Sequence, residues 1–119
     1  MIFPVKIPGL ISRIFPHFIW RINTKEKKIF LTFDDGPMDT VTPFVLDLLG
    51  DFKAKATFCC IGDNIRKYPG IYERILKEGH VVGNHTFNHL SGWNTQNEQY
   101  FSNVQKCQNY ISGNSKLFR

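Results

Sequence analysis

Two short stretches of the sequence combine residue types that can carry out metal-dependent chemistry. The first is Asp34-Asp35, which follows an apolar run and precedes Gly36-Pro37. Adjacent carboxylates repel each other, so a cation or a shared proton is needed to make the pair tolerable. Because neighbouring strand residues point to opposite sides, one carboxylate can reach a metal ion while the other faces a substrate. A simple Asp-Gly turn is the alternative interpretation.

The second stretch contains two histidines four residues apart, His85 and His89. On a helical turn this spacing presents both imidazole rings on one side, an arrangement that metal sites use. Two unrelated surface histidines are the alternative when the pair is taken alone. Combined with a carboxylate, the pair gives a ligand set with open positions for water, which is typical of catalytic rather than structural metal sites.

The elements that must position these residues alternate regularly along the chain. Apolar stretches predict strands over 28–34, 54–61 and 80–84, and apolar residues at helical spacing predict helices between and after them. This alternation is typical of a parallel α/β fold, in which functional residues gather where the strands end. Both chemical stretches directly follow predicted strands, so we expect them to meet at one edge of the sheet.

Local patterns predict where several of these elements begin. Thr42 before Pro43 predicts a helix N-cap, and Thr95 with Glu98 predicts a capping box. Residues 116–119 begin a fourth apolar segment. The expected buried faces of two helices consist of the apolar residues Phe44, Val45, Leu48, Leu49 and Phe52, and of Tyr100, Phe101, Val104, Cys107 and Ile111.

Composition and charge limit the class of protein. The 119 residues include 42% hydrophobic and 14% aromatic residues, which favours a globular chain over a disordered one. Fifteen basic and ten acidic residues give a net charge of +5 at pH 7. This excess is spread along the chain, and its one dense run (residues 25–28) contains an acid. We therefore expect no nucleic-acid partner, which would need a basic stripe with stacking aromatic residues.

The first twenty residues form a separate apolar segment. Twelve of them are apolar, but Lys6, Arg13 and three prolines interrupt the run, so neither a transmembrane helix nor a signal peptide is predicted. Between residues 7 and 18 the apolar residues follow helical spacing. We expect this stripe to pack on the domain, with contact between residues 1–20 and a membrane surface as the alternative.

The three cysteines and Trp93 are further residues whose types could carry chemistry. Cys59 and Cys60 are neighbours in a predicted strand and cannot easily form a disulfide with each other, so we expect free thiols that fill the core. Cys107 is expected on the buried face of its helix. Trp93 either stacks on a sugar ring or packs on the domain.

At this point a known family can be identified. TFDDGP (Thr32–Pro37) and HTFNH (His85–His89) together resemble the first two motifs of the polysaccharide deacetylase family, also known as the NodB homology domain or carbohydrate esterase family four. The resemblance runs from about Lys28 to the last residue. It implies an α/β fold, namely the amino-terminal half of a distorted (β/α) barrel. The expected organisation is an apolar and basic segment over 1–27 and a partial deacetylase domain over 28–119.

The resemblance also implies roles for individual residues. Asp34 would be the general base, and Asp35, His85 and His89 would bind a divalent metal, usually Zn²⁺. Thr86 would support the metal-binding loop, Arg119 would orient the base, and Trp93 is a candidate substrate-binding residue. The implied reaction is hydrolysis of acetyl groups on N-acetylated or O-acetylated polysaccharide or oligosaccharide, such as chitin oligomers or peptidoglycan.

The sequence departs from the family pattern after Arg119. The later family motifs, one of which supplies the general acid, are absent from these 119 residues, so we expect a partial domain with impaired activity. A metal- or carbohydrate-binding relic without turnover is the alternative. Free cysteines favour a cytoplasmic location, whereas the polymeric substrates of the family favour the cell envelope.

Overall fold

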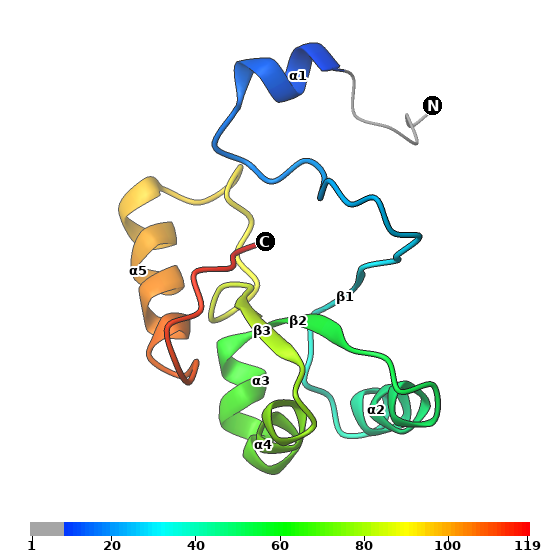
Figure 1. Ribbon diagram of the computed structural model, residues 1–119. Helices are drawn as coiled ribbons and strands as arrows, with labels where there is room; N and C mark the ends of the chain where they lie inside the picture. Colours follow the sequence, from blue (N-terminus) through cyan, green and yellow to red (C-terminus); the bar gives the residue numbers. More distant parts are fainter. Residues whose placement is uncertain (1–8) are drawn as a thin grey trace, which may run out of the picture.

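A three-stranded parallel sheet forms the centre of the computed structural model, which describes residues 9–119 (Figure 1). The strands lie in the order of the sequence and are β1 (Leu31–Asp34), β2 (Ala56–Cys60) and β3 (Val81–Asn84). In the register of the sheet, Asp34 pairs with Cys59 and Cys60 pairs with Asn84. The carboxyl ends of the strands therefore meet at one edge, as expected from the sequence.

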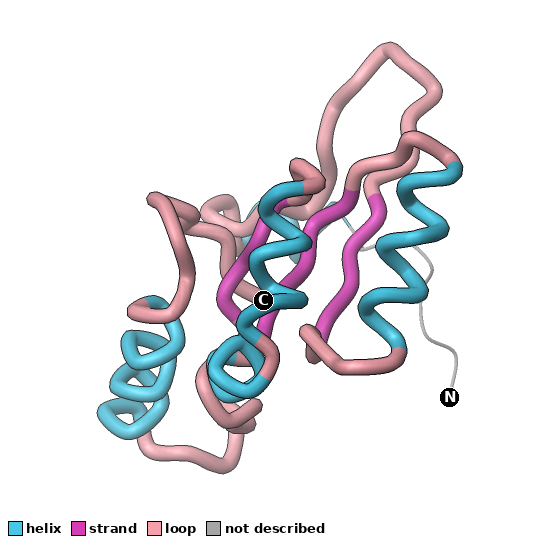
Figure 2. Tube along the Cα trace, turned by 90° about the horizontal axis from the view of Figure 1, so that it is seen from below, coloured by secondary structure: helices cyan, strands magenta, loops and turns pink. Residues whose placement is uncertain are grey.

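Helices connect the strands, as Figure 2 shows. They are α2 (Val41–Asp51) between β1 and β2, α3 (Gly62–Lys67) and α4 (Pro69–Lys77) between β2 and β3, and α5 (Asn97–Gln108) after β3. This arrangement confirms the predicted α/β class with a parallel sheet.

The core lies between these helices and one face of the sheet. Its buried members come from β2, β3, the four connecting helices and the loops next to α5. They are Leu46, Leu49, Ala56, Phe58, Cys60, Ile65, Tyr72, Ile75, Val82, Phe87, Cys107 and Ile111. Phe33 packs against this core, with its ring stacked 5.3 Å from that of Phe58. Because strand residues alternate between faces, Thr32, Asp34 and Cys59 lie on the other face of the sheet.

The predicted fourth apolar segment pairs with β3. Phe118 forms an isolated parallel bridge with Asn84. The N–H of Asn84 donates to the carbonyl of Leu117 (2.8 Å), and the N–H of Arg119 donates to the carbonyl of Asn84 (3.1 Å). This pairing brings Arg119 to the edge of the sheet where the other functional residues lie.

Two of the predicted helix starts are wrong. The N-cap of α2 is Thr40, because the hydroxyl of Thr42 instead accepts a hydrogen bond from the N–H of Met38 (2.8 Å) in the preceding turn. The N-cap of α5 is Gln96, and no side-chain capping bond forms there, so the expected capping box of Thr95 is absent.

The predicted buried faces of two helices are also wrong in part. Phe44 and Phe52 are exposed because α2 packs through Thr42, Leu46 and Leu49, which recur at spacings of four and three residues. On α5, Cys107 is buried as expected, while Phe101 is exposed.

The described part of the N-terminal segment does not pack on the domain, contrary to our expectation. Its helix, α1 (Gly9–Ile14), contains no buried residue. The helix has fewer than two turns, and Pro16 prevents it from continuing along the stripe. The predicted stripe also includes Ile7, which lies outside the described residues.

Candidate metal centre

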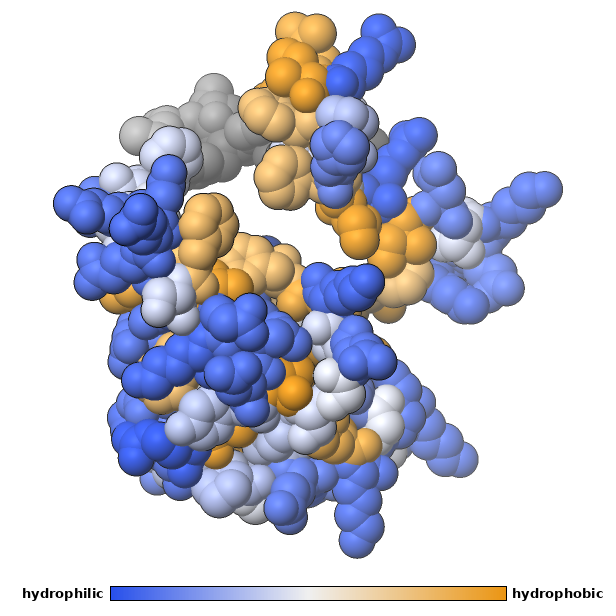
Figure 3. Space-filling model, turned by 90° about the vertical axis from the view of Figure 1, so that its left-hand side faces the viewer, coloured by the Kyte–Doolittle hydropathy of each residue, from blue (hydrophilic) through white to orange (hydrophobic). Residues whose placement is uncertain are grey.

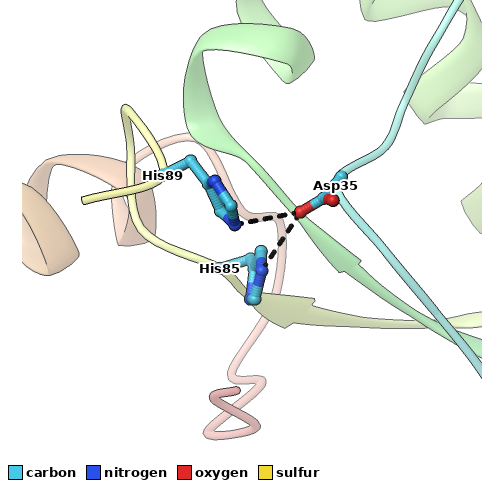
Figure 4. Close-up of side chains that lie close together, drawn as sticks. All are labelled: Asp35, His85 and His89. Carbon is cyan, nitrogen blue, oxygen red and sulfur yellow. Dashed lines mark ion pairs between the residues drawn. The ribbon is translucent and has the colours of Figure 1, made fainter. Parts of the chain in front are cut away.

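Asp35, His85 and His89 point toward one another at the carboxyl edge of the sheet (Figure 4). Nε2 of each histidine lies 3.2 Å from Oδ1 of Asp35. The candidate ligand atoms of all three residues lie within 4.8 Å of one another. The side chains of Asp35 and His89 are more than half exposed, so solvent reaches the cluster. The fold thus gathers the three predicted ligands from two loops.

The spacing of these atoms suits a tetrahedral divalent ion. With metal–ligand bonds of roughly 2.0–2.1 Å, two neighbouring ligands of a tetrahedral Zn²⁺ lie about 3.3 Å apart. The two nitrogen–oxygen separations of 3.2 Å are close to this value. Imidazole and carboxylate are both acceptable ligands for zinc and related ions. The residues present therefore fit the expected ion.

The backbone of Arg119 determines which nitrogen of His85 is free to bind a metal. Nδ1 of His85 contacts the carbonyl oxygen of Arg119. Since a carbonyl can only accept a hydrogen bond, Nδ1 carries the proton and Nε2 keeps its lone pair. Outer partners of this kind orient metal-binding histidines. The sequence did not indicate this contact, because a backbone atom makes it.

Three residues in the two loops that carry the cluster have left-handed backbone conformations. Their φ angles are 67° at Asp35, 63° at Thr86 and 56° at His89. This region is unfavourable for residues other than glycine and persists only where surrounding contacts hold it. Nδ2 of Asn64 donates to the carbonyl of Asp35 (2.7 Å), and the N–H of Leu90 donates to Oγ1 of Thr86 (3.1 Å). The hydroxyl of Thr86 is therefore placed to support the loop.

Two asparagines that the sequence did not single out also hold the histidine loop. Oδ1 of Asn103, on α5, accepts hydrogen bonds from the N–H groups of Phe87 (2.7 Å) and Asn88 (3.1 Å). Oδ1 of the buried Asn84 accepts one from the N–H of Thr86 (2.9 Å). No local motif marks Asn103, because the packing of α5 beside the loop brings it there.

Asp34 directly precedes Asp35 and pairs with Arg119. Nε of Arg119 lies 3.4 Å from Oδ2 of Asp34, and Nη1 donates to Oγ1 of Thr32 (2.8 Å). The guanidinium is thus fixed between two residues on the same face of β1. This contact brings Arg119 beside the carboxylate of Asp34, and the role in orienting the base that the family resemblance implies for Arg119 stays a prediction.

Cys59 lies beside Asp34, although the sequence predicted only a core-filling role. Burial, the negative charge of Asp34 and a hydrogen bond to its side chain raise the pKa of the Cys59 thiol to about 11, with a smaller opposing effect from Arg119. The thiol is therefore protonated at neutral pH and can donate to the carboxylate. The register between β1 and β2 creates this contact, and no sequence pattern encodes it.

Other residues of types that can carry chemistry lie outside the three-residue cluster. Trp93 is 98% exposed, so it does not pack on the domain, and its contact with a sugar stays a prediction. His80 is buried at the amino end of β3, where Nδ1 accepts the N–H of Ala56 (3.2 Å). Burial, assisted by the charge of Lys55 and opposed by Glu78, lowers the pKa of His80. All three cysteines are buried free thiols.

Comparison with known sequences identifies related proteins. The family model described as polysaccharide deacetylase matches residues 21–117. A peptidoglycan-N-acetylglucosamine deacetylase from Bacillus cereus is 46% identical over 99 residues, which cover 83% of this chain and 43% of that protein. A chitooligosaccharide deacetylase from Azorhizobium caulinodans is 40% identical over 96 residues, which cover 78% of this chain and 46% of that protein. The chain thus spans less than half the length of these relatives.

Solved structures share the same fold. The peptidoglycan deacetylase PdaC from Bacillus subtilis matches with a TM-score of 0.75 and 32% identity, covering 82% of this chain and 50% of that structure. A family 4 acetyl xylan esterase from Clostridium thermocellum, in complex with a cobalt ion, matches with a TM-score of 0.64 and 32% identity. The match covers 76% of this chain and 46% of that structure. These similarities confirm the deacetylase-type α/β fold that the two sequence motifs imply.

Proposed function

Because this chain belongs to the polysaccharide deacetylase family, we propose that the protein removes acetyl groups from an acetylated polysaccharide or oligosaccharide by metal-dependent hydrolysis. The observation that carries the proposal is the convergence of Asp35, His85 and His89 directly beside Asp34. A cation site next to a second carboxylate is the arrangement that a hydrolase needs to activate water.

The residues divide the chemistry between them. A divalent ion held by Asp35, His85 and His89 would polarise the acetyl carbonyl and lower the pKa of a water molecule. Asp34 is the general base and accepts a proton as that water attacks the carbonyl carbon. A carbon–oxygen bond would form and the carbon–nitrogen bond would break. The departing nitrogen would take up the proton held by Asp34, directly or through solvent water, so that acetate and a free amine are released and Asp34 is ionised again. Arg119 and Cys59, which both contact the carboxylate of Asp34, would hold it in one orientation during this step.

The metal is most simply Zn²⁺, because the nitrogen–oxygen spacing in the cluster suits tetrahedral coordination. The cobalt ion in the acetyl xylan esterase structure supports a divalent ion more generally. The substrate is inferred from relatives that are named for peptidoglycan N-acetylglucosamine and for chitooligosaccharide. Both substrates contain N-acetylated glucosamine, so an N-acetylated sugar polymer is our first choice and an O-acetylated one the second.

The release of acetate tests this proposal. The protein is stripped of metal with a chelator, reloaded with Zn²⁺, and incubated with chitooligosaccharide or peptidoglycan. We expect metal-dependent loss of acetyl groups, detected by mass spectrometry of the oligosaccharide. Absence of metal binding would contradict the proposed site.

Metal binding without acetate release on any of these substrates would indicate the alternative, a binding relic. One observation favours that alternative for these 119 residues. Within the region that matches the family, the one histidine besides the two ligands is His80. His80 is buried at the amino end of β3, whereas the cluster lies at the carboxyl end of the sheet. His80 therefore cannot donate a proton to a leaving amine at the cluster. We therefore expect slow turnover and choose an assay that detects single acetyl losses.

A further inference from the structure

The N-terminal segment, defined here as residues 9–28, exposes a concentrated apolar surface. Its exposed large apolar residues are Leu10, Ile11, Ile14, Phe15, Phe18, Ile19, Trp20 and Ile22. Figure 3 shows apolar side chains gathered at the top of the molecule, where Figure 1 places α1. Scattered exposed apolar residues are ordinary on protein surfaces, whereas a contiguous group of this size marks an interaction site.

Three aromatic residues of the segment pack against one another. The rings of Phe15 and Phe18 are 6.1 Å apart and those of Phe18 and Trp20 are 5.9 Å apart, both edge to face. The indole N–H of Trp20 donates to the carbonyl of Phe15 (2.8 Å). The aromatic cluster therefore has a defined shape and satisfies its indole donor while its rings remain exposed to solvent.

The charges around the aromatic cluster are all of one sign. Arg13 and Arg21 flank it, and no acidic residue occurs between residues 9 and 25. Lys25, Lys27 and Lys28 follow, and the segment's single acid, Glu26, forms an ion pair with Lys28 (2.5 Å). Apolar and aromatic side chains bordered by Lys and Arg are the pattern of segments that lie in the interface of an anionic bilayer.

We propose that the N-terminal segment docks on an anionic lipid membrane, with Phe15, Phe18 and Trp20 inserted at the level of the headgroups. No helix of the described residues is long and apolar enough to cross a bilayer. Exposed aromatic side chains bordered by basic residues are instead typical of a segment that lies in the membrane interface. Charge complementarity favours an anionic lipid surface over a purely apolar protein partner. A purely apolar partner would not need the arginines that flank the aromatic cluster. The family match begins at residue 21, so the aromatic cluster lies outside the region that the enzyme family shares.

Docking would turn the side of the sheet that carries the candidate metal centre toward the membrane. In Figure 1, α1 lies on the same side of the sheet as the loop that carries His85 and His89. The inference does not rest on the proposed function, because lipid binding and acetate release are measured separately.

Co-sedimentation with vesicles tests the proposal on the full 119-residue chain. We expect binding to vesicles of equal parts phosphatidylglycerol and phosphatidylcholine, and much weaker binding to phosphatidylcholine alone. The double variant Phe15→Ser/Phe18→Ser should lower the partition coefficient about tenfold. Replacing Arg13 and Arg21 by Gln should lower it about fivefold per residue at low salt. Circular dichroism checks that each variant folds.

The matched control is Phe44→Ser/Phe101→Ser, which removes two exposed phenylalanines, one on α2 and one on α5. This pair should leave the partition coefficient unchanged. Equal losses for the two double variants, or equal binding to anionic and neutral vesicles, would overturn the proposal. So would a Phe15/Phe18-dependent dimer that does not bind vesicles, because a second copy would then be the occupant.

Tryptophan fluorescence gives an independent measurement, because the chain contains two tryptophans, Trp20 and Trp93. In a Trp93→Phe variant, anionic vesicles should shift the emission of Trp20 to shorter wavelength and protect it from iodide quenching. In the matched Trp20→Phe variant, Trp93 should show neither change. A Trp20 that is already protected without vesicles would overturn the proposal, since the segment would then pack on its own domain.

Discussion

Asp34 and Asp35 are neighbours in the sequence, yet their side chains have different partners. Asp35 faces two imidazole rings, while Asp34 faces a guanidinium and a protonated thiol. The difference arises because Asp34 is the last residue of β1, whereas Asp35 has already turned into a left-handed conformation. Two carboxylates with such different surroundings can act as metal ligand and as base.

Substitution of the two aspartates should therefore have separable effects. We expect Asp35→Ala to abolish tight Zn²⁺ binding, because it removes the carboxylate that both histidines face. We expect Asp34→Asn to bind Zn²⁺ with the native affinity and to lose at least about a hundredfold in turnover, the usual contribution of a general base. Titration calorimetry measures the first effect and acetate release the second.

Asp39→Asn serves as the control for both substitutions, since Asp39 is exposed and contacts Thr40 rather than the cluster. Tight zinc binding by the Asp35→Ala variant would contradict the ligand assignment. Native turnover by the Asp34→Asn variant would contradict the assignment of the base.

His80 should make the stability of the chain depend on pH. Burial lowers the pKa of His80 in the folded chain, so near pH 6 the unfolded chain binds a proton more readily than the folded one. The free energy of unfolding is thus largest above the unfolded-state pKa of about 6.5 and falls as the pH drops below it. His80→Asn keeps an acceptor for the N–H of Ala56 and removes the titration. Urea unfolding at about pH 7.5 and about pH 5.5, with a chelator present, measures the free energy of unfolding of both proteins. The difference between the two pH values should be smaller in the variant than in the native chain. Equal differences would exclude His80 as the cause.

At the scale of elements, the histidine loop depends on α5. Asn103 holds two N–H groups of the loop, and the helix reaches it because Gly62 leaves room. A Cβ atom at Gly62 would lie 2.5 Å from Cδ2 of Phe87 and 3.0 Å from Cα of Cys107. The close contact between α3, the loop and α5 therefore requires glycine at position 62.

Removal of the Asn103 side chain should weaken metal binding without unfolding the chain. We expect Asn103→Ala to lower Zn²⁺ affinity by roughly tenfold to a hundredfold, as for other residues that support metal ligands. Gln105→Ala is the matched control, because Gln105 is exposed on the same helix and bonds to Asn109. Titration calorimetry compares the two variants. Equal affinities would show that the loop does not need α5.

Local patterns in the sequence predicted the order of the elements and the two loops that bring carboxylates and imidazoles together, and the family resemblance implied which three residues are the ligands. Strand-like runs before Asp34 and His85 were enough to place them at one edge of a parallel sheet. The contact between Cys59 and Asp34 could not be predicted, because it depends on the register between two strands. The start of α2 was misjudged by two residues, since the hydroxyl of Thr42 bonds to the preceding turn instead of capping the helix.

At the scale of the whole molecule, the apolar surface is incompletely covered on the side of β1. β1 has a strand neighbour on one side only within the described sheet. Beside it lies a groove of about 310 Å³ with an entirely apolar lining of Leu31, Phe33, Val45, Leu48, Leu49, Phe52 and Ala54. The chain spans less than half the length of the curated relatives that it matches, and the described residues leave this surface open to solvent.

The 119-residue polypeptide should therefore self-associate through this groove. An unpaired edge strand beside an apolar surface favours pairing with another chain, so we expect concentration-dependent oligomers and binding of the dye anilinonaphthalene sulfonate. Phe52→Lys should reduce both effects, because Phe52 lines the groove and is 79% exposed, so a charge there costs the monomer little. Phe101→Lys, on the exposed side of α5, should change neither. Sedimentation velocity measures the oligomers, and dye fluorescence measures the exposed apolar surface. A monomer that binds no dye would show that the groove does not drive association. Equal changes in oligomer content for the two lysine variants would show the same.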